Sequence, residues 1–281
     1  MIAIDLGSNT LRACKMERLS SGEFECVYSF ERIVGSARGL SSAGLADEAM
    51  ERIRIAIGEL CMQAKFSSSI AVATEAFRQA VNSAEFFSQI QAEFGIKFNI
   101  ISGELEADLT RLGVENRARI LNLKLDNSLL IDLGGASTEI SFGEVSRSFS
   151  FGIITALESD KRAEISMAME FMRKFKFNNI ILTSGVPTTI AGLKQGLNYA
   201  NYRADLINGV QIKNTDLNWA INLLKTAPNK DELVGKNRAD LIVKGCEILL
   251  NLIGLSPCIV IDDGLREGLF IAKKLNLKEI K

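Results

Sequence analysis

Short apolar runs and segments of helical period alternate along this 281-residue chain, and the same alternation occurs twice. In the first half, three apolar or alternating runs predict consecutive strands at Met1–Leu6, Leu11–Arg18 and Phe24–Ile33. Apolar residues at helical spacing then predict a helix over Glu48–Phe66. Further along, the pattern predicts a buried strand, a helix and another strand, at Ile70–Ala73, from about Ser83 to Phe94, and at Phe98–Ile101.

The second half opens in the same way. Three predicted strands lie at Ser128–Leu133, Thr138–Phe142 and Arg147–Phe151. A helix, a strand at Ile180–Thr183 and a further helix are expected next, and a last buried strand is expected at Cys258–Ile261. Each half therefore has three strands followed by alternating helices and strands.

This doubled pattern is typical of the actin-like ATPase and sugar-kinase fold, an α/β class with two ribonuclease H-like domains. In that fold the ligand lies in the cleft between the domains. No linker rich in proline or serine marks a boundary, and we place it near Gly113, which gives domains at 1–112 and 113–281. The C-terminal helix, at 265–281, is able to pack on the first domain.

A short motif is repeated at the start of each half. Ile4-Asp5-Leu6-Gly7-Ser8-Asn9-Thr10 returns as Ile131-Asp132-Leu133-Gly134-Gly135-Ala136-Ser137-Thr138, with the two aspartates 127 positions apart (132 minus 5). An apolar strand that ends in Asp and a glycine turn can hold a metal-bound phosphate, because such a turn presents backbone amides at close range. The bland alternative is a pair of tight hairpin turns.

The net charge and the amino-acid composition exclude several classes of protein and reaction. Net charge is −1, which does not indicate a nucleic-acid or membrane-surface protein. The chain has no histidine, which excludes Ser-His-Asp and Cys-His hydrolases and His-ligated zinc. Acid–base chemistry must therefore fall to Asp, Glu, Lys, Tyr or Cys, and any metal held by oxygen ligands is expected to be magnesium or calcium.

Five scattered cysteines without a C-x-x-C pair indicate reduced thiols, and no charged segment precedes the first predicted strand. The longest uncharged stretch, residues 248–261, is too short to span a bilayer. We therefore expect a cytoplasmic protein without membrane or nucleic-acid partners.

Five motifs in order make the chain resemble the exopolyphosphatase / guanosine pentaphosphate phosphohydrolase family of the actin-like superfamily. They are Ala3–Arg12, Ala73-Thr74-Glu75-Ala76-Phe77-Arg78, Ile101-Ser102-Gly103-Glu104-Leu105-Glu106-Ala107, Asp132–Glu139 and Gly264-Leu265-Arg266-Glu267-Gly268. The chain stops where long members continue into a histidine-dependent helical domain, so it resembles the short, two-domain form. Family members often pair, so the resemblance also implies a possible homodimer.

The resemblance implies a hydrolase of terminal phosphoanhydride bonds in inorganic polyphosphate, in the alarmone guanosine pentaphosphate, or in both. Such a reaction needs a cation, donors for the developing charge and a positioned water. We assign Asp5, Asp132 and Glu139 to a Mg²⁺ site, directly or through waters. The phosphate-binding candidates are Gly7, Ser8, Asn9, Thr10, Arg78, Gly134, Gly135, Ala136, Ser137 and Thr138.

Two candidates need comment. Ala136 stands where the family commonly has a third glycine, and its methyl group would either crowd the phosphate or be tolerated. Arg78 offers a guanidinium fork that matches phosphate oxygens, although a surface arginine on a helix is the bland alternative.

The resemblance places the family's catalytic glutamate at Glu106, which would orient and deprotonate the attacking water. Acids in a first helical turn also favour the helix dipole, a role that suits Glu104 better. Two other functions stay open: a non-hydrolytic regulator that binds alarmone or polyphosphate, and an actin-like ATPase or kinase. Val186-Pro187 stands where such ATPases have small residues near adenosine, which favours the phosphatase.

Overall fold

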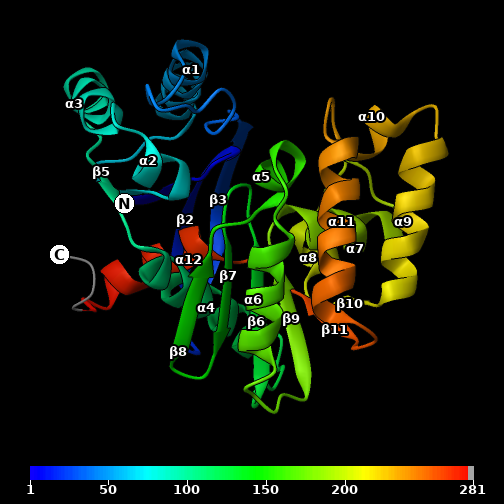
Figure 1. The fold of residues 1–281 in the computed structure, drawn as a ribbon. Coiled ribbons are helices and arrows are strands. Elements are labelled where there is room, and N and C mark those ends of the chain that lie inside the picture. Colours follow the sequence, from blue (N-terminus) through cyan, green and yellow to red (C-terminus); the bar gives the residue numbers. More distant parts are fainter. Residues whose placement is uncertain (278–281) are drawn as a thin grey trace. The chain divides into compact units, whose positions relative to one another are not determined.

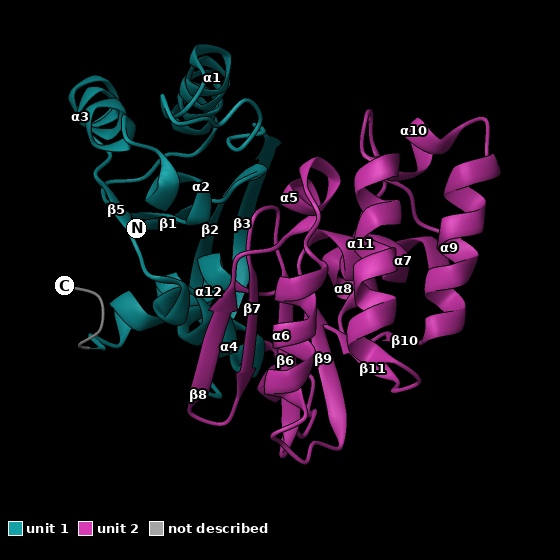
Figure 2. Cartoon of the chain, viewed as in Figure 1, with its two compact units in different colours: residues 1–116, 265–281 teal, residues 117–264 magenta. Residues whose placement is uncertain are grey.

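The computed structural model describes residues 1–277, which form two compact units (Figure 2). Unit 1 comprises residues 1–116 and the chain from Leu265 onward, and unit 2 comprises residues 117–264. The sequence pattern placed the boundary after residue 112, whereas the observed division falls after Asn116, inside a long helix. The helix that begins at Leu265 belongs to unit 1, the part of the chain on which the C-terminal helix was expected to be able to pack.

Unit 1 is built on a five-stranded sheet with the order β3-β2-β1-β4-β5 (Figure 1). The strands are β1 (Ile2–Leu6), β2 (Thr10–Arg18), β3 (Phe24–Ile33), β4 (Ser69–Ala73) and β5 (Phe98–Ile100). The first three form an antiparallel meander, whereas β4 runs parallel to β1 and β5 runs parallel to β4. The carboxyl ends of β1, β4 and β5 therefore lie at one edge of the sheet.

Helices cover both faces of this sheet. They are α1 (Asp47–Gln63), α2 (Glu75–Gln79), α3 (Ser83–Phe94), α4 (Gly103–Ile120) and α12 (Leu265–Lys274), with α1 and α3 on one face and α4 and α12 on the other (Figure 1). Because β1 is covered on both sides, four of its five residues are buried, with Asp5 only partly covered. Val72 of β4 packs with Leu109 of α4 and Leu269 of α12 in one apolar cluster.

Unit 2 repeats this strand order with one addition. Its sheet runs β10-β11-β9-β6-β7-β8, from β6 (Ser128–Leu133), β7 (Thr138–Phe142), β8 (Val145–Phe149), β9 (Asn179–Thr183), β10 (Gln211–Ile212) and β11 (Cys258–Val260). Again a meander, β6-β7-β8, is followed by two parallel strands, β9 and β11. The short β10 pairs antiparallel to β11 at the edge.

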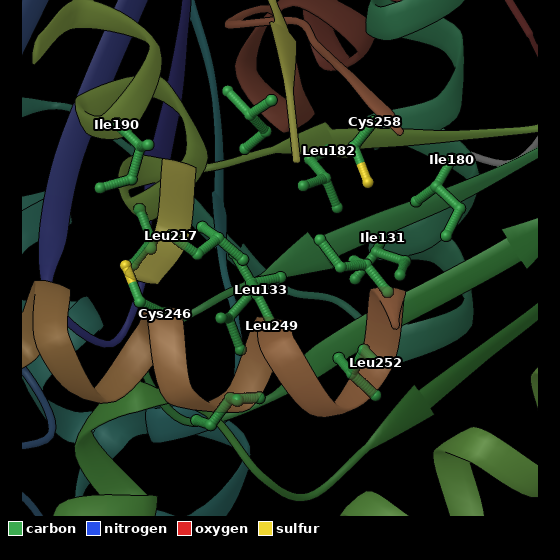
Figure 3. Close-up of a cluster of buried hydrophobic side chains, with 14 of the residues drawn as sticks. Ile131, Leu133, Ile180, Leu182, Ile190, Leu217, Cys246, Leu249, Leu252 and Cys258 are labelled. Carbon is green, nitrogen blue, oxygen red and sulfur yellow. The ribbon is translucent and has the colours of Figure 1, made fainter. Parts of the chain in front are cut away.

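The helices of unit 2 are α5 (Ile153–Glu158), α6 (Arg162–Met172), α7 (Gly185–Lys194), α8 (Ala204–Ile207), α9 (Asn214–Thr226), α10 (Lys230–Val234) and α11 (Ala239–Ile253). The α11 helix supplies much of the core. Figure 3 shows its Cys246, Leu249 and Leu252 beside side chains of β6 and β9 such as Ile131 and Leu182.

Most predicted strands are confirmed, and three differences have physical reasons. The predicted strand at Arg147–Phe151 is observed as β8, two residues earlier, because Val145 already pairs with Phe142 across a tight turn. The α1 helix ends at Gln63 rather than Phe66, because Ala64 has extended backbone. Short helices such as α2 and α10 were not predicted, since five residues carry too little periodicity.

The state of the cysteines agrees with the expectation of reduced thiols. Cys14, Cys246 and Cys258 are buried, and all five cysteines are free. Desolvation raises the pKa of Cys246 and of Cys258 to about 12. None of the helices within residues 1–277 is both long enough and apolar enough to cross a bilayer.

Gly268 is the contact point between α12 and α4, which leads to a stability prediction. A Cβ at this position would overlap the carbonyl group of Leu109, which is part of the α4 backbone and cannot move aside. Gly268→Ala is therefore expected to lower the free energy of unfolding by about 3 kcal/mol or more. Urea unfolding monitored by circular dichroism measures the change.

Gly58→Ala is the matched control, because Gly58 lies inside α1 of the same unit and an added Cβ would make ordinary contact with Phe94. This variant should gain up to about 1 kcal/mol from helix propensity. Equal effects of the two substitutions would contradict the close approach of α12 to α4.

Candidate phosphate and metal site

Three predicted site elements of unit 1 lie at one edge of its sheet. The Asp5–Thr10 loop follows β1, the helix that bears Arg78 follows β4, and the first turn of α4, which bears Glu106, follows β5. Backbone hydrogen bonds join these strand ends, from Thr74 N–H to the Leu6 carbonyl (3.3 Å) and from Ile101 N–H to the Ala73 carbonyl (3.1 Å). Ligands of open α/β sheets bind at such carboxyl ends.

The first loop is a tight turn closed by its own backbone. The N–H of Gly7 donates to the carbonyl of Thr10 at 2.9 Å, so Gly7 contributes shape rather than a free donor. A neighbouring loop holds the turn from outside, because Val34 and Gly35 donate to the carbonyl of Asn9, and Ala37 donates to that of Ser8. The peptide N–H groups of Ser8 and Asn9 are the natural candidates for an anion at this turn.

The second loop, in unit 2, repeats this closure. The N–H of Gly134 donates to the carbonyl of Ser137 at 3.0 Å, and a Cβ on Gly134 would lie 2.9 Å from that oxygen. The first amides of α5 do not face outward, since Ile153 and Ile154 donate to the carbonyls of Gly134 and Gly135. Two backbone hydrogen bonds from the start of α5 therefore stabilise this loop.

Ala136 and Thr138 of the second loop are both buried. Ala136 is only 4% exposed, and Gly152 packs so closely on its backbone that a Cβ there would overlap it. The methyl group is therefore covered by protein and is not displayed on the surface. Thr138 is fully buried and its hydroxyl donates to the Phe151 carbonyl at 2.7 Å, so it braces the loop.

The two halves differ in charge at one equivalent position. Asp5 pairs across the strands with Arg12, whereas Asp132 pairs with Glu139, and in both cases the partner lies seven residues later. Directly opposed residues point to the same face of a sheet, with Cβ atoms about 5 Å apart. Arg12 in turn forms an ion pair with Glu31 (3.0 Å), so the first half has a cation at the position where the second half has Glu139.

The second half instead gathers carboxylates. Glu139 is 3% exposed and accepts a hydrogen bond from the Ser148 hydroxyl at 2.7 Å, while Asp132 lies opposite it. Two opposed carboxylates favour a cation, and Mg²⁺ is commonly held by one or two carboxylates together with water and phosphate oxygens. The assignment of Asp132 and Glu139 to a magnesium ion stays a prediction, as does that of Asp5.

Residues 1–277 contain no group of three or more Cys, Asp or Glu side chains close enough to hold a metal by themselves. Asp5 belongs to unit 1, whereas Asp132 and Glu139 belong to unit 2. The joint metal site, and the cleft expected between the domains, stay predictions.

Glu106 is held in a defined orientation in the first turn of α4. It is 8% exposed, whereas Glu104 of the same turn is exposed to solvent, as the dipole role assigned to Glu104 requires. The Ser102 carbonyl accepts the Glu106 N–H at 3.0 Å, and the Ser102 hydroxyl accepts that of Leu105 at 3.2 Å. This end of the helix is thus capped by Ser102.

Arg78 makes the ion pair that orients Glu106. Its Nη1 lies 3.0 Å from Glu106 Oε2 and donates to the Ile101 carbonyl at 2.7 Å. Burial alone would lower the pKa of Arg78, but the carboxylates of Glu106 and Glu75 outweigh it and raise that pKa. Direct phosphate binding by Arg78 stays a prediction, since its donors here contact protein acceptors.

Two residues that the sequence reasoning did not select belong to these sites. Glu75 contacts Arg78 at 2.6 Å, and its position three residues earlier on the same helix was a usable signal. Ser148 contacts Glu139 from β8, which only the strand register reveals.

The end of β9 carries backbone strain beside the second loop. Ser184 has φ 84° and ψ 177°, a region that is essentially restricted to glycine, and its hydroxyl donates to the Leu133 carbonyl at 2.8 Å. Val186, one turn further, is fully buried against Gly245 of α11. This segment therefore packs tightly where ATPases have small residues.

Arg266 lies in the last family motif. It is buried at the start of α12, and its side chain forms an ion pair with the neighbouring Glu267. Its backbone carbonyl accepts a hydrogen bond from the Cys14 thiol of β2.

The chain matches a known protein family and several solved structures. The model of the family described as "Ppx/GppA phosphatase family" matches residues 17–277, a range that begins after the Asp5 loop. Among solved structures, the Aquifex aeolicus PPX-GPPA enzyme is 23% identical with a TM-score of 0.76, and the alignment covers 96% of this chain and 98% of that one. An exopolyphosphatase from Cytophaga hutchinsonii is 20% identical with a TM-score of 0.77, covering 99% and 98%. These likenesses confirm the α/β fold of the actin-like class.

The opposed carboxylates of unit 2 predict metal-dependent stability. At a Mg²⁺ concentration 100 times the Kd, the wild-type protein should gain about 2.7 kcal/mol in free energy of unfolding. Glu139→Gln should lose most of this gain, because a neutral amide replaces one of the two anionic ligands. Thermal unfolding with and without Mg²⁺ measures it.

Glu144→Gln serves as the control, since Glu144 is exposed in the β7–β8 turn of the same hairpin. It should keep the full Mg²⁺ effect. A Mg²⁺ response in Glu139→Gln equal to that of wild type would exclude Glu139 as a ligand.

Proposed function

We propose that this chain, which belongs to the Ppx/GppA phosphatase family, hydrolyses the terminal phosphoanhydride bond of inorganic polyphosphate or guanosine pentaphosphate with the help of Mg²⁺. The observation that carries the proposal is the buried, oriented carboxylate of Glu106 at the same sheet edge as the Asp5–Thr10 turn. One group positions water and the other offers amides to phosphate.

Glu106 is suited to the role of general base. Arg78 lies 3.0 Å from one carboxylate oxygen, so this ion pair holds the carboxylate in one orientation. The carboxylate that this ion pair orients is the group proposed to accept the proton from water. The side chain is also nearly buried, so its orientation is fixed before substrate binds.

The phosphate end of the substrate would be bound by the glycine turns. In unit 1 the amides of Ser8 and Asn9 follow Gly7, whose own N–H group closes the turn, and in unit 2 Gly135 follows Gly134, which closes its turn in the same way. When bound at Asp132 and Glu139, Mg²⁺ would neutralise phosphate oxygens and stabilise charge on the leaving group.

The reaction balances as a hydrolysis. Glu106 takes one proton from water while the water oxygen bonds to the terminal phosphorus, and the bond from that phosphorus to the bridging oxygen breaks. The products are inorganic phosphate and a chain shorter by one phosphoryl group. The bridging oxygen leaves with the shortened chain.

The covered methyl group of Ala136 is compatible with phosphate binding at this turn, which the hydrolase and the non-hydrolytic regulator both require. The choice between polyphosphate and guanosine pentaphosphate is made by experiment. Phosphate release should be measured from polyphosphate of several lengths, from guanosine pentaphosphate and from ATP, with and without Mg²⁺. Release from ATP alone would contradict the proposal.

Replacement of the proposed base supplies the sharper prediction. Glu106→Gln should lower kcat by a factor of about 10²–10⁴, because the amide cannot accept the proton, while substrate binding is retained. Phosphate release and equilibrium binding of a fluorescent polyphosphate probe measure the two properties separately.

Glu104→Gln is the matched control from the same helical turn, because it removes an equal charge from an exposed side chain. Its kcat should stay within a factor of about two to three of wild type. Normal turnover in Glu106→Gln would remove Glu106 from the mechanism.

A further inference from the structure

Glu75 occupies one edge of the Arg78 guanidinium. Its Oε2 accepts a hydrogen bond from Nε of Arg78 at 2.8 Å and lies 2.6 Å from Nη2, so this oxygen lies against that edge of the guanidinium. Its other oxygen accepts a hydrogen bond from the Gln79 side-chain amide at 2.6 Å. Glu75 is thus fixed at both oxygens, with a side chain that is 13% exposed.

This arrangement determines which guanidinium nitrogen reaches the proposed base. Because Nε and Nη2 face Glu75, Nη1 is directed to Glu106 and to the Ile101 carbonyl. Because the guanidinium is planar and rigid, the contacts that hold Nε and Nη2 also fix the direction of Nη1. Glu75 therefore sets the position of Arg78, and Arg78 sets that of the Glu106 carboxylate.

We propose that Glu75 is a positioning residue for hydrolysis, which acts on Glu106 only through Arg78. The inference rests on the proposed role of Glu106 as general base. A displacement of about 1 Å in a catalytic group can lower the rate by about 10²-fold, so the orientation of this carboxylate has a measurable effect.

If Glu75 only stabilised the fold, its substitution would have different effects on stability and on kcat. Glu75 is the first residue of α2, where a carboxylate favours the helix dipole, and pairs three residues apart are common on helices. Either effect would change stability and leave kcat unchanged. The proposal requires a change in kcat that disappears once Arg78 is absent.

The experiment is a double-mutant cycle in the full-length protein, with kcat and KM measured for phosphate release from polyphosphate in Mg²⁺. Glu75→Ala should lower kcat about 10- to 100-fold with KM within about threefold of wild type. Glu75→Gln should recover most of that loss, because its amide oxygen can still accept from the same edge of Arg78.

The comparison of the double variant with Arg78→Ala tests whether Glu75 acts through Arg78. Arg78→Ala combined with Glu75→Ala should lose no more activity than Arg78→Ala alone, since the proposal connects Glu75 to Glu106 through Arg78. Multiplicative losses, or a kcat of Glu75→Ala equal to wild type, would overturn the proposal. If the Ala variants unfold, the same cycle is measured with Glu75→Met and Arg78→Met, which keep much of the side-chain volume without the charge, and urea unfolding confirms that these variants fold.

Glu85→Ala is the control for the dipole effect, because Glu85 lies in the first turn of neighbouring α3 and is exposed. Its kcat should equal that of wild type. A wild-type protein that releases no phosphate from any substrate would overturn the proposed function and this inference with it. An active wild type with an additive cycle would overturn the role of Glu75 alone.

Discussion

The parallel pairing of β1 with β4 and of β4 with β5 is the constraint on which the candidate site depends. It brings three strand ends to one edge, and the residues that follow them are far apart in sequence. The Asp5 turn, Arg78 and Glu106 are assembled in this way without any long loop. The site is therefore as rigid as the sheet, which suits chemistry that depends on positioning more than on covalent steps.

The same framework is used twice, with opposite charge at one position. Both Asp-Gly turns are closed by the same backbone hydrogen bond, at 2.9 Å for Gly7 and 3.0 Å for Gly134. Opposite the aspartate, however, stands Arg12 in unit 1 and Glu139 in unit 2. The first half therefore carries an internal counter-charge, whereas the second collects negative charge that favours a cation.

Buried charges recur where position matters. Arg78 with Glu106, and Arg117 with Asp263 at 2.9 Å, are ion pairs whose side chains are at most 20% exposed. Both residues of the second pair belong to unit 2, Arg117 at its first position and Asp263 one residue before its last. Buried pairs are weak evidence for stability, because desolvation offsets much of the attraction. Their directional hydrogen bonds nevertheless hold the groups in one geometry.

The sequence alone determined the repeated strand pattern, the fold class and the motifs, because alternation of apolar residues and glycine turns are local signals. It also singled out Glu106, through resemblance rather than through physics. Only the tertiary structure decided that Arg78 faces Glu106 and Glu75, that Glu139 faces Asp132 and Ser148, and that the Ala136 methyl is covered. These facts depend on strand register and on packing between elements distant in sequence. Such contacts leave no periodic trace in the chain, which is why they could not be predicted from it.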